Sequence, residues 1–183
     1  MAITDSWLIF KGYDPSIRRP GRSPMAEAVF RSVVASSTTL AIGDIDSAGT
    51  ASYHALDPPD SRTISTLRRH GITDYEHAAR AVTKEDFRTF DYILAMDGSN
   101  LRNLLRMCKN VRSGEKIAEV RLFGDFSPDG TQSCVDGGEE VQDPYYGGTQ
   151  GFEEVYEQAV RFSKAFLACL ETKRKAGGVV EAS

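Results

Sequence analysis

The sequence predicts a single α/β domain, in which an open parallel β-sheet of about four strands is covered by helices on both faces. Three observations lead to this fold class. Short apolar runs alternate with amphipathic stretches in the order β-α-β-α-β-α-β-α, which requires right-handed crossovers between parallel strands. The 183 residues, 40% of them hydrophobic, suffice for one sizeable core. No internal repeat divides the chain.

The first strand and the first helix are predicted near the amino terminus. Residues 7–10 form a short apolar run, which is typical of a buried strand. Apolar residues recur at three- and four-residue steps over residues 24–34, which predicts a helix. We expect Ser23 to cap this helix and Pro24 to occupy its first position, since both residue types are favoured there.

The next elements are a strand over residues 41–48 and a helix over residues 60–70. Gly71 follows that helix and is expected to end it, because glycine readily adopts the left-handed conformation that closes helices. Thr83, followed by Asp86 three residues later, predicts the start of another helical turn.

The second half begins with residues 92–96, an apolar segment rich in β-forming residues that predicts a central strand. A helix is expected over residues 100–108 and a fourth strand over residues 119–123. The last and longest helix is predicted over residues 152–170. Between them, residues 127–140 are rich in glycine, aspartate and serine, which indicates a long loop.

Composition limits the function. The formal net charge of -4 disfavours nucleic-acid binding through a basic surface. No apolar run approaches the length of a membrane span and no basic, apolar leader is visible, so we expect a soluble cytoplasmic protein without a membrane partner. Widely separated cysteines and histidines predict reduced thiols and no metal site. They are Cys108, Cys134, Cys169, His54, His70 and His77.

Two segments carry candidate chemistry. Arg22 and Ser23 precede Pro24 at a predicted helix start, where free N–H groups and the helix dipole favour an anion. The alternative is an ordinary helix cap beside a solvated arginine. Asp143 precedes a proline and paired tyrosines, an arrangement that suits a general acid beside aromatic pocket walls. The alternative for this segment is a turn.

Five segments together carry a resemblance to a known family. They are residues 22–27 (RSPMAE), 46–50 (DSAGT), 59–62 (PDSR), 90–93 with 96–100 (FDYI and MDGSN) and 143–147 (DPYYG). In order and spacing they are similar to low-molecular-weight protein tyrosine phosphatases. The resemblance covers residues 22–170 and implies the phosphatase-I-like open parallel sheet of that family.

The resemblance implies hydrolysis of phosphotyrosine proteins or small aryl phosphates in two steps, without a metal or an organic cofactor, by a monomer or weak dimer. In the family, a C-x5-R loop wraps the phosphate, the cysteine attacks phosphorus, and an aspartic acid protonates the leaving group. By position, the catalytic residues are Arg22 as the phosphate clamp and Asp143 as the acid. Substrate-binding positions are Ser23, Tyr53, Tyr145 and Tyr146, and those that support the loop are His77 and Asp97.

The nucleophile position departs from the family. Ser16, not a cysteine, stands six residues before Arg22. A thiol with a reference pKa of about 8.5 can ionise in such a site, whereas a serine hydroxyl needs an adjacent base. Asp14 is unsuited as that base, because its charge would repel a phosphate dianion. Pro20 further removes one N–H donor from the loop, and residues 11–15 lengthen it.

These observations divide the chain into three predicted parts: a divergent segment of residues 1–21, a phosphatase body of residues 22–172, and a flexible tail of residues 173–183. The sharp boundary at residue 21 is explained by an alternative first exon or by evolved loss of the nucleophile. Two functions stay open, an impaired phosphatase and a pseudophosphatase that binds phosphotyrosine proteins through Arg22, Arg18 and Arg19. An arsenate reductase would need a relay of cysteines that starts at the missing nucleophile.

Overall fold

The computed structural model describes residues 5–11 (backbone only), 21–37, 40–49, 58–111, 117–126, 138–144 and 148–178. In these ranges the strands are β1 (Asp5–Lys11), β2 (Ile42–Gly49), β3 (Tyr92–Ala95) and β4 (Glu119–Leu122). The helices are α1 (Arg22–Ala35), α2 (Ser61–Arg69), α3 (Asp86–Thr89), α4 (Gly98–Cys108) and α5 (Gly148–Gly178). Each lies where the sequence predicts an element, with shifted ends.

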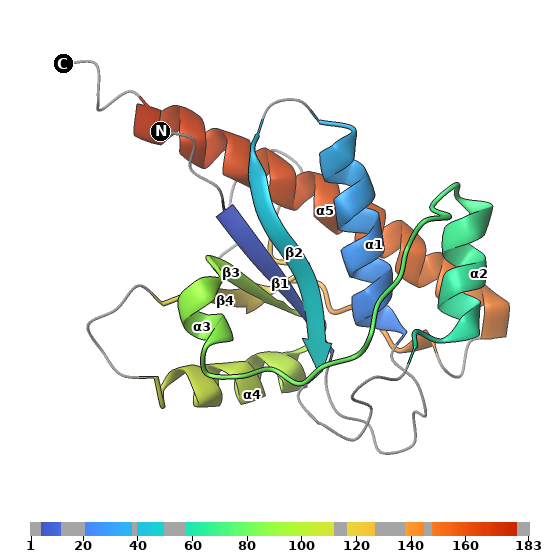
Figure 1. Ribbon diagram of the computed structural model, residues 1–183, viewed down its shortest axis with the longest axis horizontal. Helices are drawn as coiled ribbons and strands as arrows, with labels where there is room; N and C mark the ends of the chain where they lie inside the picture. Colours follow the sequence, from blue (N-terminus) through green and yellow to red (C-terminus); the bar gives the residue numbers. More distant parts are fainter. Residues whose placement is uncertain are drawn as a thin grey trace.

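The four strands form one parallel sheet in the order β2-β1-β3-β4, which confirms the predicted fold class (Figure 1). β1 lies at the centre, where Phe10 pairs with Ala95 of β3 and Lys11 pairs with Gly49 of β2. The divergent amino-terminal segment therefore supplies a central strand. The carboxyl ends of β1, β2 and β3 meet at one edge of the sheet, where parallel sheets bind ligands.

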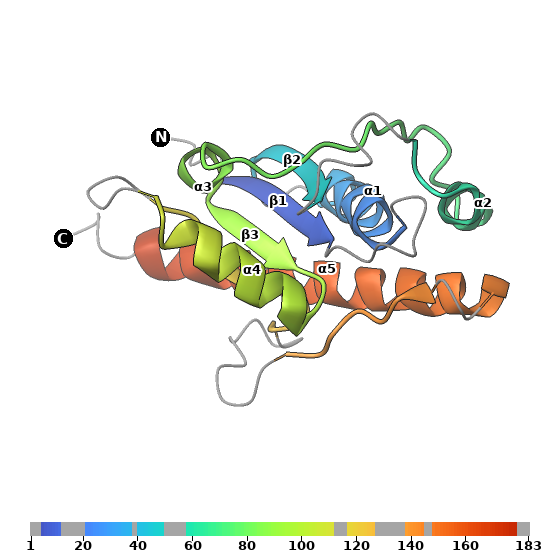
Figure 2. The same cartoon turned by 90° about the horizontal axis from the view of Figure 1, so that it is seen from below.

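Helices cover both faces of the sheet, and β3 shows how the two cores form (Figure 2). Its successive side chains point to opposite faces, as in any strand. Tyr92 and Leu94 join a core with α1 and α5, whereas Ile93 and Ala95 join a second core with α3 and α4. In the larger core, Phe166 of α5 packs edge-on against Tyr92, with the ring centroids 5.4 Å apart.

The start of α1 differs from the prediction. The helix begins at Arg22, and Gly21 is the N-cap residue without any side-chain cap bond. The expected cap, Ser23, lies within the first turn, and Pro24 is the third helical residue. The predicted cap was wrong because the helix starts two residues earlier, closed by a bond from the Met25 N–H to the Gly21 carbonyl.

Of two other predicted ends, one is shifted and one is confirmed. The Thr83 N–H donates to Asp86 over 2.7 Å, but the single turn of α3 begins only at Asp86, with Glu85 as its N-cap. α2 ends at Arg69, and Gly71 follows with a positive φ of 81°. The Gly71 N–H donates to the Arg68 carbonyl, so the glycine closes the helix as predicted.

Replacing Gly71 with alanine is expected to lower the free energy of unfolding by about 1–2 kcal/mol, measured by urea denaturation. The cost is backbone strain alone, because an added Cβ would meet no atom within 4 Å. Gly71→Asn is the matched control and should cost less, since asparagine tolerates positive φ. Equal losses for the two variants would contradict this explanation.

The end of α5 requires a correction. The helix continues to Gly178, through residues 173–178 that the sequence assigned to a flexible tail. Lys173 donates to the Tyr92 hydroxyl over 2.7 Å and to Glu119 over 3.2 Å, which fastens this turn to the start of β3 and β4. Residues 179–183 lie outside the described residues. No helix in the described part of the chain combines the length and apolarity needed to cross a membrane.

Candidate active site

Arg22 lies at the carboxyl edge of the sheet as the first residue of α1, with only 7% of its surface exposed. One terminal nitrogen, Nη1, donates to the Val141 carbonyl. The other, Nη2, lies 2.9 Å from Asp97 Oδ2 and 3.8 Å from Asp143 Oδ2. The structure therefore brings together three residues that are distant in sequence and that the sequence analysis selected.

Asp97 holds the site together through its two carboxylate oxygens. It follows β3 and is the N-cap of α4, where its Oδ1 accepts from the Asn100 N–H over 2.8 Å. Its Oδ2 accepts from Arg22. The same carboxylate thus ties the first turn of α4 to the first turn of α1 and fixes the Arg22 guanidinium.

Asp143 stands near the end of a short described segment, residues 138–144, which is anchored on two sides. Toward the sheet, the Val141 N–H donates to the Met96 carbonyl over 2.7 Å. Toward α5, Glu139 accepts from Arg161 over 2.7 and 2.9 Å, and these bonds lower the pKa of Glu139. With its backbone held this way, the Asp143 carboxyl stays at the site while 27% of its side-chain surface is exposed.

Two buried polar atoms at the start of α1 have no hydrogen-bond partner among the described residues. They are Arg22 Nε and the Ser23 hydroxyl, on a residue that is 2% exposed. Burying such groups without a partner costs about 1–3 kcal/mol each. Together with the N–H groups at a helix start, they provide unused donors for an anion at this edge.

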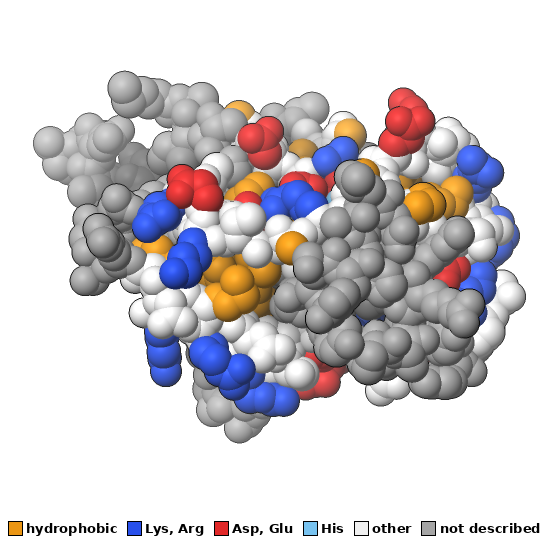
Figure 3. All heavy atoms as spheres, turned by 60° about the horizontal axis from the view of Figure 1, so that its bottom comes forward, with side chains coloured by type: hydrophobic (Ala, Val, Ile, Leu, Met, Phe, Trp, Pro, Cys, Tyr) orange, Lys and Arg blue, Asp and Glu red, His pale blue; other side chains and the backbone are white. Residues whose placement is uncertain are grey.

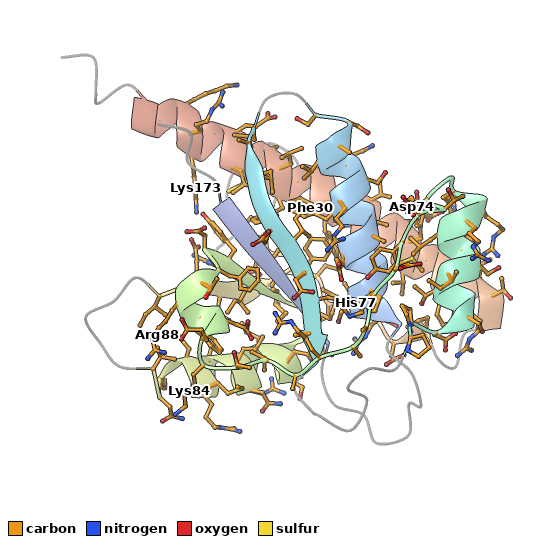
Figure 4. The ribbon with its side chains drawn as sticks, in the orientation of Figure 1. Phe30, Asp74, His77, Lys84, Arg88 and Lys173 are labelled. Atoms are coloured by element: carbon orange, nitrogen blue, oxygen red, sulfur yellow. The ribbon has the colours of Figure 1, made fainter. Side chains whose placement is uncertain are left out.

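A second cluster lies behind the site, around Glu27 of α1, which is 1% exposed. Its Oε2 accepts from the Ser47 hydroxyl over 2.6 Å and from the Tyr75 hydroxyl over 2.9 Å. His77 Nδ1 lies 3.1 Å from the same oxygen, and Arg31 lies 2.8 Å from Oε1. Figure 4 shows His77 beside α1 and β2, midway along the segment that joins α2 to α3.

The electrostatics of this cluster favour an ionised Glu27. Burial alone would raise its pKa, but hydrogen bonds from His77 and Ser47, together with the charge of Arg31, hold that pKa below its ordinary value. Burial beside this carboxylate raises the pKa of Tyr75, so the phenol remains a donor. His77 is predicted from the sequence as a site residue, whereas Glu27 and Ser47 are not, although both occur within segments that carry the family resemblance.

One group of described residues has the donor types and spacing to hold a metal ion. It comprises Glu27, Asp46 and His77, whose potential ligand atoms lie within 4.8 Å of one another. These oxygens already accept strong hydrogen bonds, since Asp46 pairs with Arg80 over 2.6 Å and Glu27 binds Ser47 and Tyr75. Glu27 Oε1 accepts no hydrogen bond among the described residues but lies 2.8 Å from Arg31, so the group is explained as a network of hydrogen bonds and ion pairs.

Six positions that the sequence offers as candidate site residues lie outside the described residues. They are Ser16, Arg18, Arg19, Tyr53, Tyr145 and Tyr146. The predicted pocket walls and the missing nucleophile therefore stay predictions from sequence, whereas Arg22, Ser23, His77, Asp97 and Asp143 have described positions.

Comparison with known proteins identifies relatives over most of the chain. The family model described as low molecular weight phosphotyrosine protein phosphatase matches residues 18–176. Phosphatases of that name from Gallus gallus and Homo sapiens are 47% and 45% identical over 146 residues, or 80% of this chain and 86% of each relative. The Schizosaccharomyces pombe protein is 46% identical over 147 residues, or 80% of this chain and 87% of the relative.

Solved structures agree with these relatives. The crystal structure of Primo-1 matches with a TM-score of 0.70 and 32% identity, over 90% of this chain and 97% of that one. A protein tyrosine phosphatase from Entamoeba histolytica, with Hepes in its active site, matches with a TM-score of 0.70 and 30% identity, over 93% and 99%. The structural match thus covers more of the chain than the curated sequence matches do.

Proposed function

This chain belongs to the low molecular weight phosphotyrosine protein phosphatase family, and from that membership we propose that it binds phosphotyrosine and small aryl phosphates at the start of α1. The observation that carries the proposal is the buried Arg22 guanidinium, 3.8 Å from Asp143, whose Nε has no hydrogen-bond partner among the described residues. A planar guanidinium matches two phosphoryl oxygens. The Ser23 hydroxyl, which has no partner in the part of the chain that the structure describes, and the helix dipole favour the same anion.

Asp143 suits the role of general acid in this arrangement. A phosphate ester bound to Arg22 would lie close to the Asp143 carboxyl. The protonated carboxyl can then donate to the leaving phenolate oxygen as the ester bond breaks. Water completes the hydrolysis, and the products are a phenol and inorganic phosphate.

Ser16 at the nucleophile position limits turnover in this proposal. A serine hydroxyl without an adjacent base attacks phosphorus far more slowly than a thiolate does. We therefore infer that the chain binds phosphate esters but hydrolyses them slowly. The second candidate, a pseudophosphatase that holds phosphotyrosine proteins without turnover, is favoured by the same serine. Cytoplasmic location and a monomer or weak dimer stay predictions from sequence.

Titration with a phosphotyrosine peptide and its unphosphorylated form tests binding. We expect the phosphopeptide to bind with a dissociation constant below about 1 mM and the other peptide to bind weakly, with a difference that shrinks as salt increases. Absence of phosphopeptide binding below that concentration would reject the proposal for both candidate functions.

Replacing Asp143 with alanine is expected to lower the rate of p-nitrophenyl phosphate hydrolysis about tenfold. This is less than the usual contribution of a positioned acid, because p-nitrophenolate leaves readily without a proton. The matched control is Asp74→Ala, at an exposed aspartate on the segment between α2 and α3. Equal rates for the two variants and the parent chain would exclude catalysis by Asp143 and favour the pseudophosphatase.

A further inference from the structure

The exposed side of α4 carries a stripe of positive charge. Arg102, Arg106 and Lys109 are all exposed and follow one another at steps of four and three residues, so they lie along one side of the helix. Leu105 lies among them with 42% of its surface exposed. Residues 98–109 contain no aspartate or glutamate, although the whole chain has 26 acidic residues. We call these four residues the basic stripe.

The cations of the basic stripe pair with no carboxylate in the part of the chain that the structure describes. Arg106 donates only to the neutral side chain of Asn103, over 3.3 Å. Arg161 of α5, which is also exposed, instead forms a bidentate pair with Glu139. The charge of the basic stripe is therefore available to an acidic partner.

The basic stripe begins beside the phosphate site and leads away from it. α4 starts one residue after Asp97, the partner of Arg22. At about 1.5 Å per residue, Arg102, Arg106 and Lys109 lie roughly 7, 13 and 18 Å from Asp97 along the helix axis. Figure 3, in which the α4 side of Figure 1 comes forward, shows lysine and arginine side chains around a hydrophobic patch.

We propose that the basic stripe binds acidic side chains that flank the phosphotyrosine of a protein substrate; this inference rests on the proposed function. An extended peptide rises about 3.3 Å per residue. The second residue from the phosphotyrosine therefore reaches Arg102, the fourth reaches Arg106, and the fifth or sixth reaches Lys109. Charge complementarity favours acidic residues there. Among the described residues, Leu105 is the one exposed large hydrophobic side chain of α4, whereas a helix that lies in a bilayer needs a continuous apolar face, which favours a peptide over a lipid surface.

Fluorescence anisotropy with three peptides tests the proposal. The first has phosphotyrosine with Asp or Glu at the second, fourth and sixth positions on both sides, the second has Asn or Gln at those positions, and the third is the acidic peptide without phosphate. We expect the acidic phosphopeptide to bind on the order of tenfold tighter than the neutral one at low ionic strength. The advantage should shrink as salt is added.

A charge-reversal variant of the basic stripe, R102E/R106E/K109E, should lose this advantage and keep its affinity for the neutral phosphopeptide. R102Q/R106Q/K109Q should lose most of it. The matched control is K164E/R174E/K175E, which changes the net charge equally at exposed positions of α5 and should keep the preference. Unchanged thermal unfolding confirms that each variant is folded.

The outcomes separate this inference from the proposed function. Equal affinities for the two phosphopeptides would overturn the inference and leave phosphotyrosine binding intact. Equal affinities for the acidic peptide with and without phosphate would instead overturn the phosphate site and leave the basic stripe as an acidic-peptide site. The inference would also be overturned if the α5 control variant lost the preference for the acidic phosphopeptide. It would likewise be overturned if the protein bound phosphatidylserine vesicles but bound the acidic and neutral phosphopeptides equally.

Discussion

Replacing Arg22 with alanine is expected to weaken phosphotyrosine peptide binding by on the order of a hundredfold or more. Removing one partner of a buried, charge-assisted contact costs about 2–5 kcal/mol, and each 1.4 kcal/mol is a factor of ten. Arg22 is the cationic side chain that the structure places at the site. Because it is only 7% exposed, water screens its contact with a phosphate only weakly. Calorimetric titration of the folded variant measures the effect.

Two further variants show whether the loss reflects the phosphate contact or the fold. Arg22→Lys keeps the charge but loses the planar fork, so we expect intermediate binding. Asp97→Asn removes the ionic partner of Arg22 and leaves the guanidinium in place, so phosphopeptide affinity should fall less than in Arg22→Ala. Binding that is unchanged in Arg22→Ala would show that the phosphate is held elsewhere.

Replacing Glu27 with alanine is expected to lower the free energy of unfolding by about 3–5 kcal/mol, the cost of breaking a buried network at its charged centre. The change would leave the buried hydroxyl of Ser47, the phenol of Tyr75 and the ring of His77 without their shared acceptor. Glu27→Gln should cost less, because the amide oxygen still accepts hydrogen bonds. Urea denaturation measures the loss.

Glu76→Ala is the matched control for this prediction, since Glu76 is exposed between Tyr75 and His77. Its free energy of unfolding should stay within about 0.5 kcal/mol of the parent chain. Comparable losses in Glu27→Ala and Glu76→Ala would mean that the segment between α2 and α3, and not the buried carboxylate, sets the stability.

The Glu27 carboxylate also predicts a pH dependence. Its pKa in the folded chain lies below the ordinary value of 4.5, so the unfolded chain binds this proton more readily. The stabilisation by Glu27 is therefore fully present above pH 4.5 and is lost as the pH falls through the folded pKa. Urea denaturation between pH 6 and pH 3 should show a steeper loss for the parent chain than for Glu27→Gln.

Arg22 and Glu27 show that the first two turns of α1 join two functions. Arg22 faces the carboxyl edge of the sheet with Asp97 and Asp143, while Glu27, one turn later, fastens the same helix to β2 and to the segment between α2 and α3. Arg22, the proposed phosphate clamp, thus lies on a helix that the Glu27 hydrogen bonds hold in place.

The sequence by itself predicted the parallel α/β fold, which the structure confirms, and it supplied the residues proposed for the site, several of them through the family resemblance. Periodicity locates the elements because a buried face repeats its apolar residues with the helix or strand period. Arg22 and Asp143 stand out because a helix start favours anions and a loop aspartate beside tyrosines suits acid catalysis. Signals of this kind depend only on residues that are close in sequence, so they can be recognised without the three-dimensional structure.

Only the tertiary structure decided which distant residues meet. The contact of Arg22 with Asp97 and Asp143, the shared acceptor Glu27 and the fastening of Lys173 to β3 all join residues far apart in sequence. The central position of β1 is also decided by the tertiary structure. An apolar run predicts a strand, but which strands lie beside it depends on how the sheet pairs. These features depend on three-dimensional packing, in which burial and partner atoms, not local propensity, set the free energy.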